Sequence, residues 1–370
     1  MKLQIQYDGM AACDYNDIGF ANCTPIQYNI LKITSEKEVL GMNIYDVAEK
    51  AGVSITTVSR VLNGSSKVSD KTLMKVKKVM EELNYMPSQI AVGLATNSTK
   101  TIGIMLPDVR DSFHASIAYI IESKMSAKGY TCILCNTSVE NNNEADYMNS
   151  LYGKKVDGII LVGSSYHKAS IDEVYNQWTQ KIPIVLINAI SVEGTASVVC
   201  DEKDGMVQAL THLRQRGYSH PVFMKDQSKY QARTSETKAR MFLLAYEEVF
   251  QSKELPEIYS CLPDEEEYKK LLKKIKPETI DSILFTNDMS CAIFLKTMEK
   301  NGLRAPKDYA LIGFNNARIT DLTSPTITTI DHLVLEHCEE AINKLFLLME
   351  GQEVEKVTYL KPTLVIKETT

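Results

Sequence analysis

The feature that most restricts the fold of this chain is the alternation of short apolar segments with longer amphipathic segments after Lys100. Apolar runs such as residues 102–106 and 156–162 have no polar face, which is typical of strands that are buried on both sides. Segments of helical period, such as residues 115–128, lie between them. Strand–helix–strand units of this kind predict α/β structure with a parallel sheet covered by helices on both faces.

The predicted units repeat through the second half of the chain. Strands are expected at residues 102–106, 130–135, 156–162, 184–187, 221–224, 281–285, 309–314, 326–330 and 357–366, and helices at 115–128, 144–151, 236–250, 289–301 and 333–349. Ligands of such folds bind at the carboxyl ends of the strands. Side chains that follow these strands are therefore candidate ligand contacts.

The charge distribution separates a small basic segment from an acidic remainder. The net charge is −6, which on its own argues against a nucleic-acid partner. Residues 42–100, however, carry eight Lys and Arg against five Asp and Glu, which leaves −9 on the rest of the chain. A basic head on an acidic body is typical of a modular DNA-binding protein, although a solvated lysine-rich helix gives the same signal.

Several classes of protein are not supported by the sequence. No apolar run reaches the ~20 residues of a membrane helix, and Asp8, Asp14 and Asp17 interrupt any signal-peptide core. There is no Gly-rich phosphate loop, metal-spaced His/Cys cluster or nucleophile elbow, so we expect no enzyme, cofactor or metal. Cys132 and Cys135 form a C-x-x-C, but three residues apart on a buried strand they should face opposite sides. The eight cysteines suit a reducing cytoplasm.

The first 41 residues show neither helical nor strand period, and a recognisable domain begins abruptly at Met42. The codons of Lys37-Glu38-Val39 can spell a strong bacterial ribosome-binding sequence at a workable distance before Met42. We therefore expect residues 1–41 to be an over-called extension. A disordered natural tail is the alternative, and the intact mass of the native protein would separate the two.

Residues 43–64 predict two short helices joined by a tight turn. An apolar helical face ends at Ala51, Gly52 suits the left-handed end of a helix, and Ser54 is placed to cap a second helix. This is a helix-turn-helix, whose second helix enters the major groove of DNA. Its outward side chains would be Ile55, Thr56, Thr57, Ser59 and Arg60.

Each outward side chain has a distinct use against DNA. Arg60 can pair with guanine through two hydrogen bonds, and Ile55 can touch a thymine methyl group. The hydroxyls of Thr57 and Ser59 suit phosphates. A third helix, capped by Ser69, follows, and its lysines favour a solvated face.

The order of motifs resembles the LacI/GalR family of bacterial transcription regulators. The stretches that carry the resemblance are Ile44–Ala48, Ala51–Ser54, Thr57–Asn63 and Leu83–Pro87. The resemblance implies an N-terminal all-α helix-turn-helix domain over residues 42–86, a hinge helix and linker over 87–100, and a two-lobed, periplasmic-binding-protein-like effector and dimerisation domain over 101–370. It adds Tyr45, Ser54 and Asn63 to the expected DNA contacts, and it implies a homodimer on a pseudo-palindromic operator.

Residues 87–95 are expected to form the hinge. Pro87 can open a short helix that orders only when DNA packs on it. In the family a hinge leucine pries apart the central base step; the matching residue is Leu94, with Ala91 beside it. Ser88 and Val92 depart from the common Asn and Arg, which puts some contacts in doubt. An ordinary linker is the alternative.

Candidate effector contacts follow from the strand ends. Phe113 and His114 are expected in the loop after the first strand, and Asp288 is expected at a strand end where a carboxylate can hold two hydroxyls. The family resemblance places Lys238 where an effector-binding Arg is common, and places amides where Asp is frequent. The amides are Asn188 and Asn315, and Arg233 and Thr234 complete the set.

These residues favour a sugar or sugar derivative as effector, and the cationic members hint at a sugar acid or sugar phosphate. Each residue also has a structural alternative: Lys238 on a helix surface, His114 as a satisfied loop histidine, Asn315 as a turn cap. Two other functions stay open, namely control by a phosphorylated partner protein and a solute-binding receptor that uses only the body. Repression is the commoner mode in the family and is the expectation here; whether effector releases or promotes DNA binding is open.

Overall fold

The computed structural model describes residues 42–62, 67–86, 93, 98–137, 143–163, 178–189, 194–227 and 232–370. The chain divides into two compact units, with the division between Met86 and Pro87. Among the described residues, the first unit holds three short helices, and the second holds two six-stranded sheets.

The first unit is built from α1 (Ile44–Ala51), α2 (Ile55–Leu62) and α3 (Asp70–Glu82). Gly52 ends α1 with a φ of 58°, which a residue with a Cβ adopts only at a cost. Val47, Val58 and Val76, one from each helix, are fully buried in the shared core. The predicted pair of helices, the turn between them and the third helix are confirmed.

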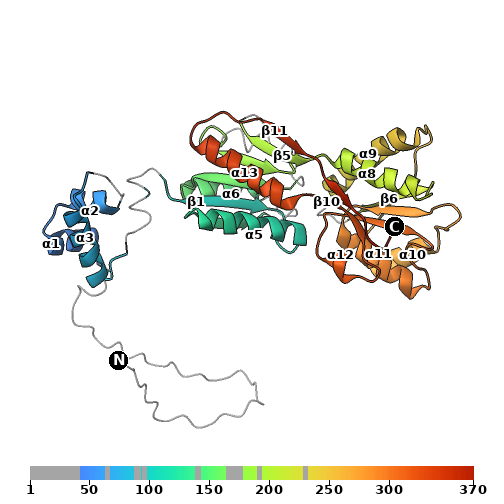
Figure 1. The fold of residues 1–370 in the computed structure, drawn as a ribbon, viewed down its shortest axis with the longest axis horizontal. Coiled ribbons are helices and arrows are strands. Elements are labelled where there is room, and N and C mark those ends of the chain that lie inside the picture. Colours follow the sequence, from blue (N-terminus) through green and yellow to red (C-terminus); the bar gives the residue numbers. More distant parts are fainter. Residues whose placement is uncertain are drawn as a thin grey trace, which may run out of the picture. The chain divides into compact units, whose positions relative to one another are not determined.

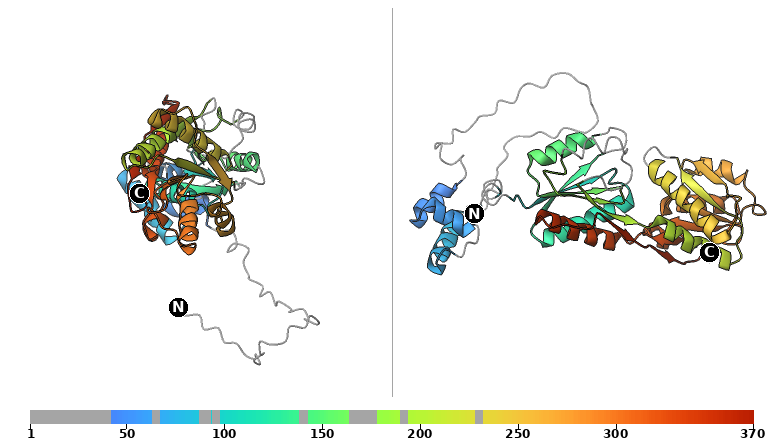
Figure 2. Two further views of the ribbon diagram at one scale, coloured as in Figure 1. Left: turned by 90° about the vertical axis from the view of Figure 1, so that its right-hand side faces the viewer. Right: turned by 90° about the horizontal axis from the view of Figure 1, so that it is seen from above.

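Lobe 1 of the second unit is a parallel sheet. Its strands are β1 (Thr101–Leu106), β2 (Thr131–Asn136), β3 (Gly158–Val162), β4 (Ile184–Ile187), β5 (Ala196–Cys200) and β11 (Val357–Leu360), in the spatial order β11-β5-β4-β3-β1-β2. Helices α5 (Ser112–Ala127) and α13 (Val334–Met349) cover one face, and α6 (Glu144–Gly153) covers the other (labelled in Figure 1; the two faces are seen in the right-hand view of Figure 2).

Lobe 2 repeats this layout, except that one edge strand is antiparallel to its neighbour. Its strands are β6 (Pro221–Asp226), β7 (Ile258–Cys261), β8 (Ser282–Phe285), β9 (Ala310–Phe314), β10 (Thr328–Asp331) and β12 (Thr363–Val365), in the order β12-β10-β9-β8-β6-β7. Helices α8 (Glu202–Gln215) and α9 (Ala232–Phe250) pack on one face. Helices α10 (Glu265–Leu272) and α11 (Asp288–Lys300) pack on the other face (Figure 1), and the short α12 (Ile319–Leu322) contacts α11.

The described chain passes between the lobes three times. It leaves lobe 1 after β5, at Asp201, and returns after β10, at His332 and Leu333. It crosses again between β11 and β12, at Lys361 and Pro362. The predicted fold class, a helix-turn-helix unit followed by two doubly wound lobes, is confirmed.

Two strand predictions need correction. The expected single strand over residues 357–366 is two strands in different sheets, because Pro362 has no N–H for a ladder and the chain crosses lobes there. The strand with Cys132 and Cys135 is an edge strand rather than a buried one, and Leu134 on it is 47% exposed. The two thiols do face opposite helical layers, as expected, and neither forms a disulfide.

Candidate functional site

The exposed face of α2 is set by its cap and its buried side. Ser54 Oγ accepts a hydrogen bond from the backbone N–H of Thr57 at 3.2 Å, which fixes the start of the helix. Val58 and Val61 are buried against the neighbouring helices. The turn of the helix therefore leaves Ile55, Thr56 and Arg60 exposed, while Thr57 and Ser59 are half-buried.

The rest of this unit adds positive charge and one aromatic side chain. Tyr45 on α1 is 65% exposed, and α3 presents exposed lysines at positions 71, 75, 77 and 78. An exposed helix face with Arg and hydroxyl side chains beside lysines can approach phosphate and base edges. Asn63, Ala91 and Leu94, which the sequence also singles out, lie outside the described residues.

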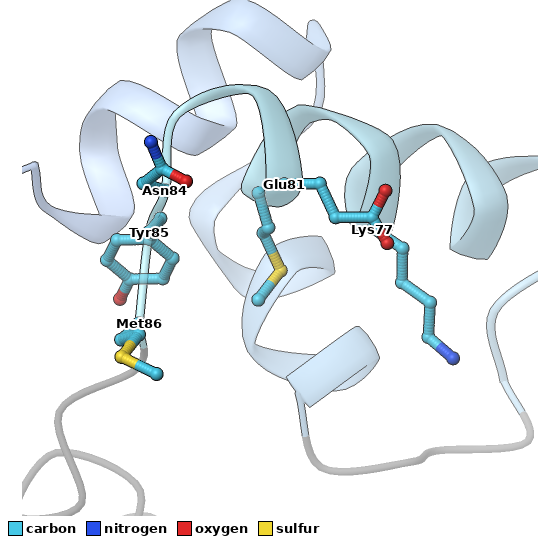
Figure 3. A pocket seen from close by; sticks show the side chains of 6 residues that line it. Lys77, Glu81, Asn84, Tyr85 and Met86 are labelled. Atoms are coloured by element: carbon cyan, nitrogen blue, oxygen red, sulfur yellow. The ribbon is translucent and has the colours of Figure 1, made fainter. Parts of the chain in front are cut away.

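An open groove lies at the end of α3. Figure 3 shows Lys77 and Glu81 on the helix and Asn84, Tyr85 and Met86 on the segment that follows it. The volume is about 360 Å³, but Met86 at its rim is 88% exposed. We assign no ligand to this groove, because long side chains at an open rim provide no enclosed set of polar contacts.

Phe113 and His114 lie in the first turn of α5 rather than in a loop. The reason is Asp111, whose Oδ1 accepts from the backbone N–H of Phe113 at 2.8 Å and thereby starts the helix three residues earlier than predicted. The Phe113 ring stacks on His332 with centroids 4.8 Å apart. His114 Nδ1 lies 3.1 Å from the carbonyl oxygen of Asp108, so this histidine already has a partner.

The two amides lie at strand ends, each with a positive φ. Asn188 follows β4 with a φ of 55°, and its Oδ1 accepts from the backbone N–H of Cys200 at 3.0 Å. Its Nδ2 is buried and has no hydrogen-bond partner in the described chain. Asn315 follows β9 with a φ of 108°, and its Oδ1 lies 3.1 Å from His332 Nδ1.

Lys238 lies inside lobe 2, with 2% of its surface exposed, so its interpretation as a helix-surface lysine is wrong. Its Nζ donates to the carbonyl oxygen of Thr286 at 3.0 Å and sits 3.8 Å from the centroid of the Phe314 ring. Burial lowers the pKa of Lys238, and the carboxylate of Glu202 opposes that change. Thr234 is half-buried on the same helix, and the side chain of Arg233 lies outside the described residues.

Asp288 is the first residue of α11, not the last residue of a strand. Its Oδ2 accepts from the backbone N–H of Ala317 at 2.7 Å, and its Oδ1 accepts from Thr329 Oγ1 at 2.6 Å. The carboxylate also packs on Gly313, where an added Cβ would collide with Oδ1. Burial raises the pKa of Asp288 to about 7. Both oxygens of this carboxylate therefore already accept a hydrogen bond from within lobe 2.

The sequence did not point to His332 or Ser235. His332 is 4% exposed, lies between Phe113 and Phe314, and has an Nε2 without a described partner. Burial and the nearby Lys238 hold the pKa of His332 well below its usual range, so the ring is neutral. Ser235 is fully buried and its Oγ has no described partner. His332 comes soon after a predicted strand, so the strand-end rule could have found it.

Neither a metal site nor a membrane segment is evident in the described ranges. No three His, Cys, Asp or Glu side chains there converge closely enough to hold a metal ion. Among the same residues, no helix has the length and apolar character needed to span a bilayer.

Two family comparisons cover most of the chain. Residues 43–88 match the bacterial regulatory proteins of the lacI family, and residues 99–342 match the periplasmic binding proteins and sugar binding domain of the LacI family. The chain belongs to the LacI family. An HTH-type transcriptional regulator of Lachnoclostridium phytofermentans is 33% identical over 338 residues, which covers 89% of this chain and 99% of the relative.

Further LacI-family comparisons agree. The sucrose operon repressor of Streptococcus mutans is 30% identical over 322 residues, which covers 86% of this chain and 95% of that protein. The solved structure of the Lac repressor dimer bound to operator and the anti-inducer ONPF has the same fold, with a TM-score of 0.78 at 23% identity, over 89% of this chain and 98% of that one. The predicted family and regulator class are confirmed: this chain is a DNA-binding transcription regulator of the LacI family.

Proposed function

We propose that this LacI-family regulator is a repressor that binds a pseudo-palindromic operator as a homodimer and answers to a sugar or sugar derivative held between its lobes. The observation that carries the DNA-binding part is the exposed face of α2, which a capped turn and a buried valine pair hold outward. The name of the sucrose operon repressor supports repression and a carbohydrate signal.

Within the operator, we assign base contacts to Ile55, Thr56 and Arg60, because these are the exposed side chains near the start of α2. Thr57 and Ser59 are half-buried and reach phosphates. Ser54, Tyr45 and Asn63 supply further contacts to the DNA backbone. Ala91 and Leu94 enter the minor groove from the hinge.

Dimerisation is supported by exposed apolar side chains on adjoining elements of each lobe. Tyr119 on α5 is 72% exposed, and Leu134 on the edge strand β2 is 47% exposed. In lobe 2, Met289 on α11 and Leu322 on α12 are 50% and 67% exposed. Large apolar side chains grouped on neighbouring elements mark protein interfaces, and a second copy is the partner that a two-fold operator requires.

The effector would bind where the strand carboxyl ends of the two lobes face each other. Lys238 Nζ, Asn188 and Asn315 lie at these ends, with the stacked rings of Phe113 and His332 as one wall. Thr234, Arg233 and His114 remain candidates at the margin of this set, and Asp288 supports it from behind. We infer that the chain acts in the cytoplasm and without catalysis, since its relatives are regulators of transcription.

Footprinting of the host's promoters with the purified chain from Met42 onward tests this proposal. A symmetric protected site whose occupancy changes with sugars is the expected result. An Arg60→Ala variant serves as the matched control, since it should bind the same DNA with lower discrimination. If no promoter shows a protected symmetric site, with or without metabolites, the proposed function is wrong.

A further inference from the structure

In the part of the chain that the structure describes, most of the unpaired buried polar atoms lie near the carboxyl ends of the strands. In the described residues, six buried side-chain atoms have no hydrogen-bond partner. Two of them, on Glu144 and Trp178, lie elsewhere in lobe 1. The other four belong to residues at strand ends or in the first turns of the helices that face them, and they are Asn188 Nδ2, Ser235 Oγ, His332 Nε2 and His337 Nε2. His337 is set aside, because its ring also interacts with the backbone of Val199. Native proteins pair such atoms, so a ligand is the natural partner for this group.

Most of the carboxylates around Lys238 are already engaged by protein donors. Asp111 caps α5 through the N–H of Phe113, and Asp288 accepts from Ala317 and Thr329. Lys238 is the opposite case: its ammonium has three N–H groups, and one described acceptor, the carbonyl of Thr286, lies within bonding distance. Around Lys238, the groups that still lack hydrogen-bond partners therefore include more donors than acceptors.

Ser235 and Lys238 form the lobe 2 part of this donor set. They are three residues apart on α9, so they lie on the same face of the helix, and both are at least 98% buried. They also lie within the first two turns of a 19-residue helix, where the dipole favours negative charge. A buried hydroxyl without a partner, a buried ammonium and a helix N-terminus together suit an acid group.

Asn188 extends the donor set into lobe 1. Its Oδ1 is held by the N–H of Cys200, which leaves the unpaired Nδ2 as its only free hydrogen-bonding group. The charge of Lys238 also acts on the Cys200 thiol, so the Asn188 amide and the Lys238 ammonium lie in the same region of the structure. His332 differs: with Nδ1 directed at Asn315 Oδ1, its free Nε2 is an acceptor for a hydroxyl.

We propose that the effector is a hydroxylated acid, whose carboxylate or phosphate is bound by Lys238 Nζ and Ser235 Oγ, with Asn188 Nδ2 completing the contacts and His332 Nε2 accepting from a hydroxyl. This inference rests on the proposed function, in that it takes an effector site between the lobes as given. It goes further by excluding neutral sugars as the main signal.

Glu202 is a carboxylate that would compete with the effector acid for Lys238. It is half-buried at the start of α8, and its negative charge is the largest influence favouring the charged form of Lys238. Burial raises the pKa of Glu202, while Lys238 lowers it. An acid bound to Lys238 must compete with this carboxylate. Removing the charge of Glu202 should therefore tighten acid binding, and it should not tighten the binding of a neutral sugar.

The test is calorimetric titration of the full chain with D-gluconate, D-glucuronate and D-glucose 6-phosphate, with D-glucose and D-ribose as neutral counterparts. Acetate and inorganic phosphate are titrated as well, to show whether the site prefers a carboxylate or a phosphate. We expect at least one sugar acid or sugar phosphate to bind, and no neutral sugar to bind comparably. Lys238→Met should weaken the acid roughly 30-fold or more, as for loss of one partner of a buried charged pair. Glu202→Gln should strengthen it.

Lys344→Met is the matched control, because Lys344 is as buried as Lys238 but donates to the carbonyl of Glu355 in lobe 1. It should leave acid binding unchanged, and the melting temperature of each free variant checks its folding. The proposal is overturned if no acid of the panel binds, if a neutral sugar binds as tightly, or if Lys238→Met and Lys238→Gln both keep wild-type affinity. Footprinting on the same preparations separates the two ideas: a protected operator with no acid binding overturns this inference alone.

Discussion

Removing the negative charge of Asp288 should make lobe 2 more stable. In Asp288→Asn, the amide oxygen can still accept from the N–H of Ala317, and the new NH₂ can donate to Thr329 Oγ1, whose hydroxyl rotates. The variant therefore keeps both hydrogen bonds that anchor α11 to the strands β9 and β10. It loses a carboxylate that is 1% exposed.

The size of the effect follows from linkage. An unfolded Asp loses its proton near pH 3.8, whereas burial raises the pKa of Asp288 to about 7. Between these values the folded chain keeps a proton that the unfolded chain has lost, so the free energy of unfolding falls as pH rises. The full difference corresponds to about 4 kcal/mol, of which about 3 kcal/mol lies between pH 5 and pH 8.

Urea unfolding of wild type and Asp288→Asn at pH 5, 6, 7 and 8 measures this quantity. We expect the free energy of unfolding of the variant, minus that of wild type, to rise by about 3 kcal/mol from pH 5 to pH 8. The contributions of the other titrating groups cancel in this difference. Thr329→Val, which removes the hydroxyl donor to Oδ1, should move the pH midpoint upward. Parallel pH profiles for wild type and Asp288→Asn would refute the argument.

Three further outcomes are expected. Arg60→Ala should cost about 1–3 kcal/mol of discrimination between operator and mismatched sites in a competition binding assay, and unchanged discrimination would remove Arg60 from base recognition. Leu94→Ala should weaken operator binding in gel-shift titrations while circular dichroism of the helices stays the same; undiminished affinity would argue against a hinge wedge. Tyr119→Asp should shift the chain toward monomer in sedimentation velocity, because Tyr119 is 72% exposed on α5, and a dimer as tight as wild type would place the interface elsewhere.

Local signals explain what the sequence predicted well. Gly52, Ser54 and Ser69 act within a few residues of themselves, so the helix boundaries of the first unit could be derived one turn at a time. The longest apolar runs in the sequence predicted strands of the two sheets equally well. The predicted family and fold class rested on these parts of the chain.

The missed elements carried weaker or non-local signals. β7 is four residues long with no fully buried position, and it forms because β6 lies beside it. α8 did have helical period, since Met206, Ala209, Leu210 and Leu213 are all buried, but polar residues between them concealed it. The strand over 357–366 was divided by a lobe crossing that no local pattern marks.

The site shows the same division. The strand-end rule found Phe113 and Asp288, and the family resemblance added Lys238, Asn188 and Asn315. Neither showed whether each side chain turns toward ligand or protein. Asp288 turned to two protein donors, and Phe113 turned to a histidine. Such choices depend on packing between segments far apart in the sequence, as between Phe113 and His332.

The three lobe crossings also set an order of assembly during synthesis. The parallel strands of lobe 2 are contiguous between residues 221 and 331, whereas lobe 1 needs α13 and β11, which are made more than a hundred residues after β5. A chain released by the ribosome before residue 334 would carry the first-unit helices but an open lobe 1 core. Truncated products would then expose the apolar face that α13 covers, and proteases could remove them before they occupied DNA without a working sensor.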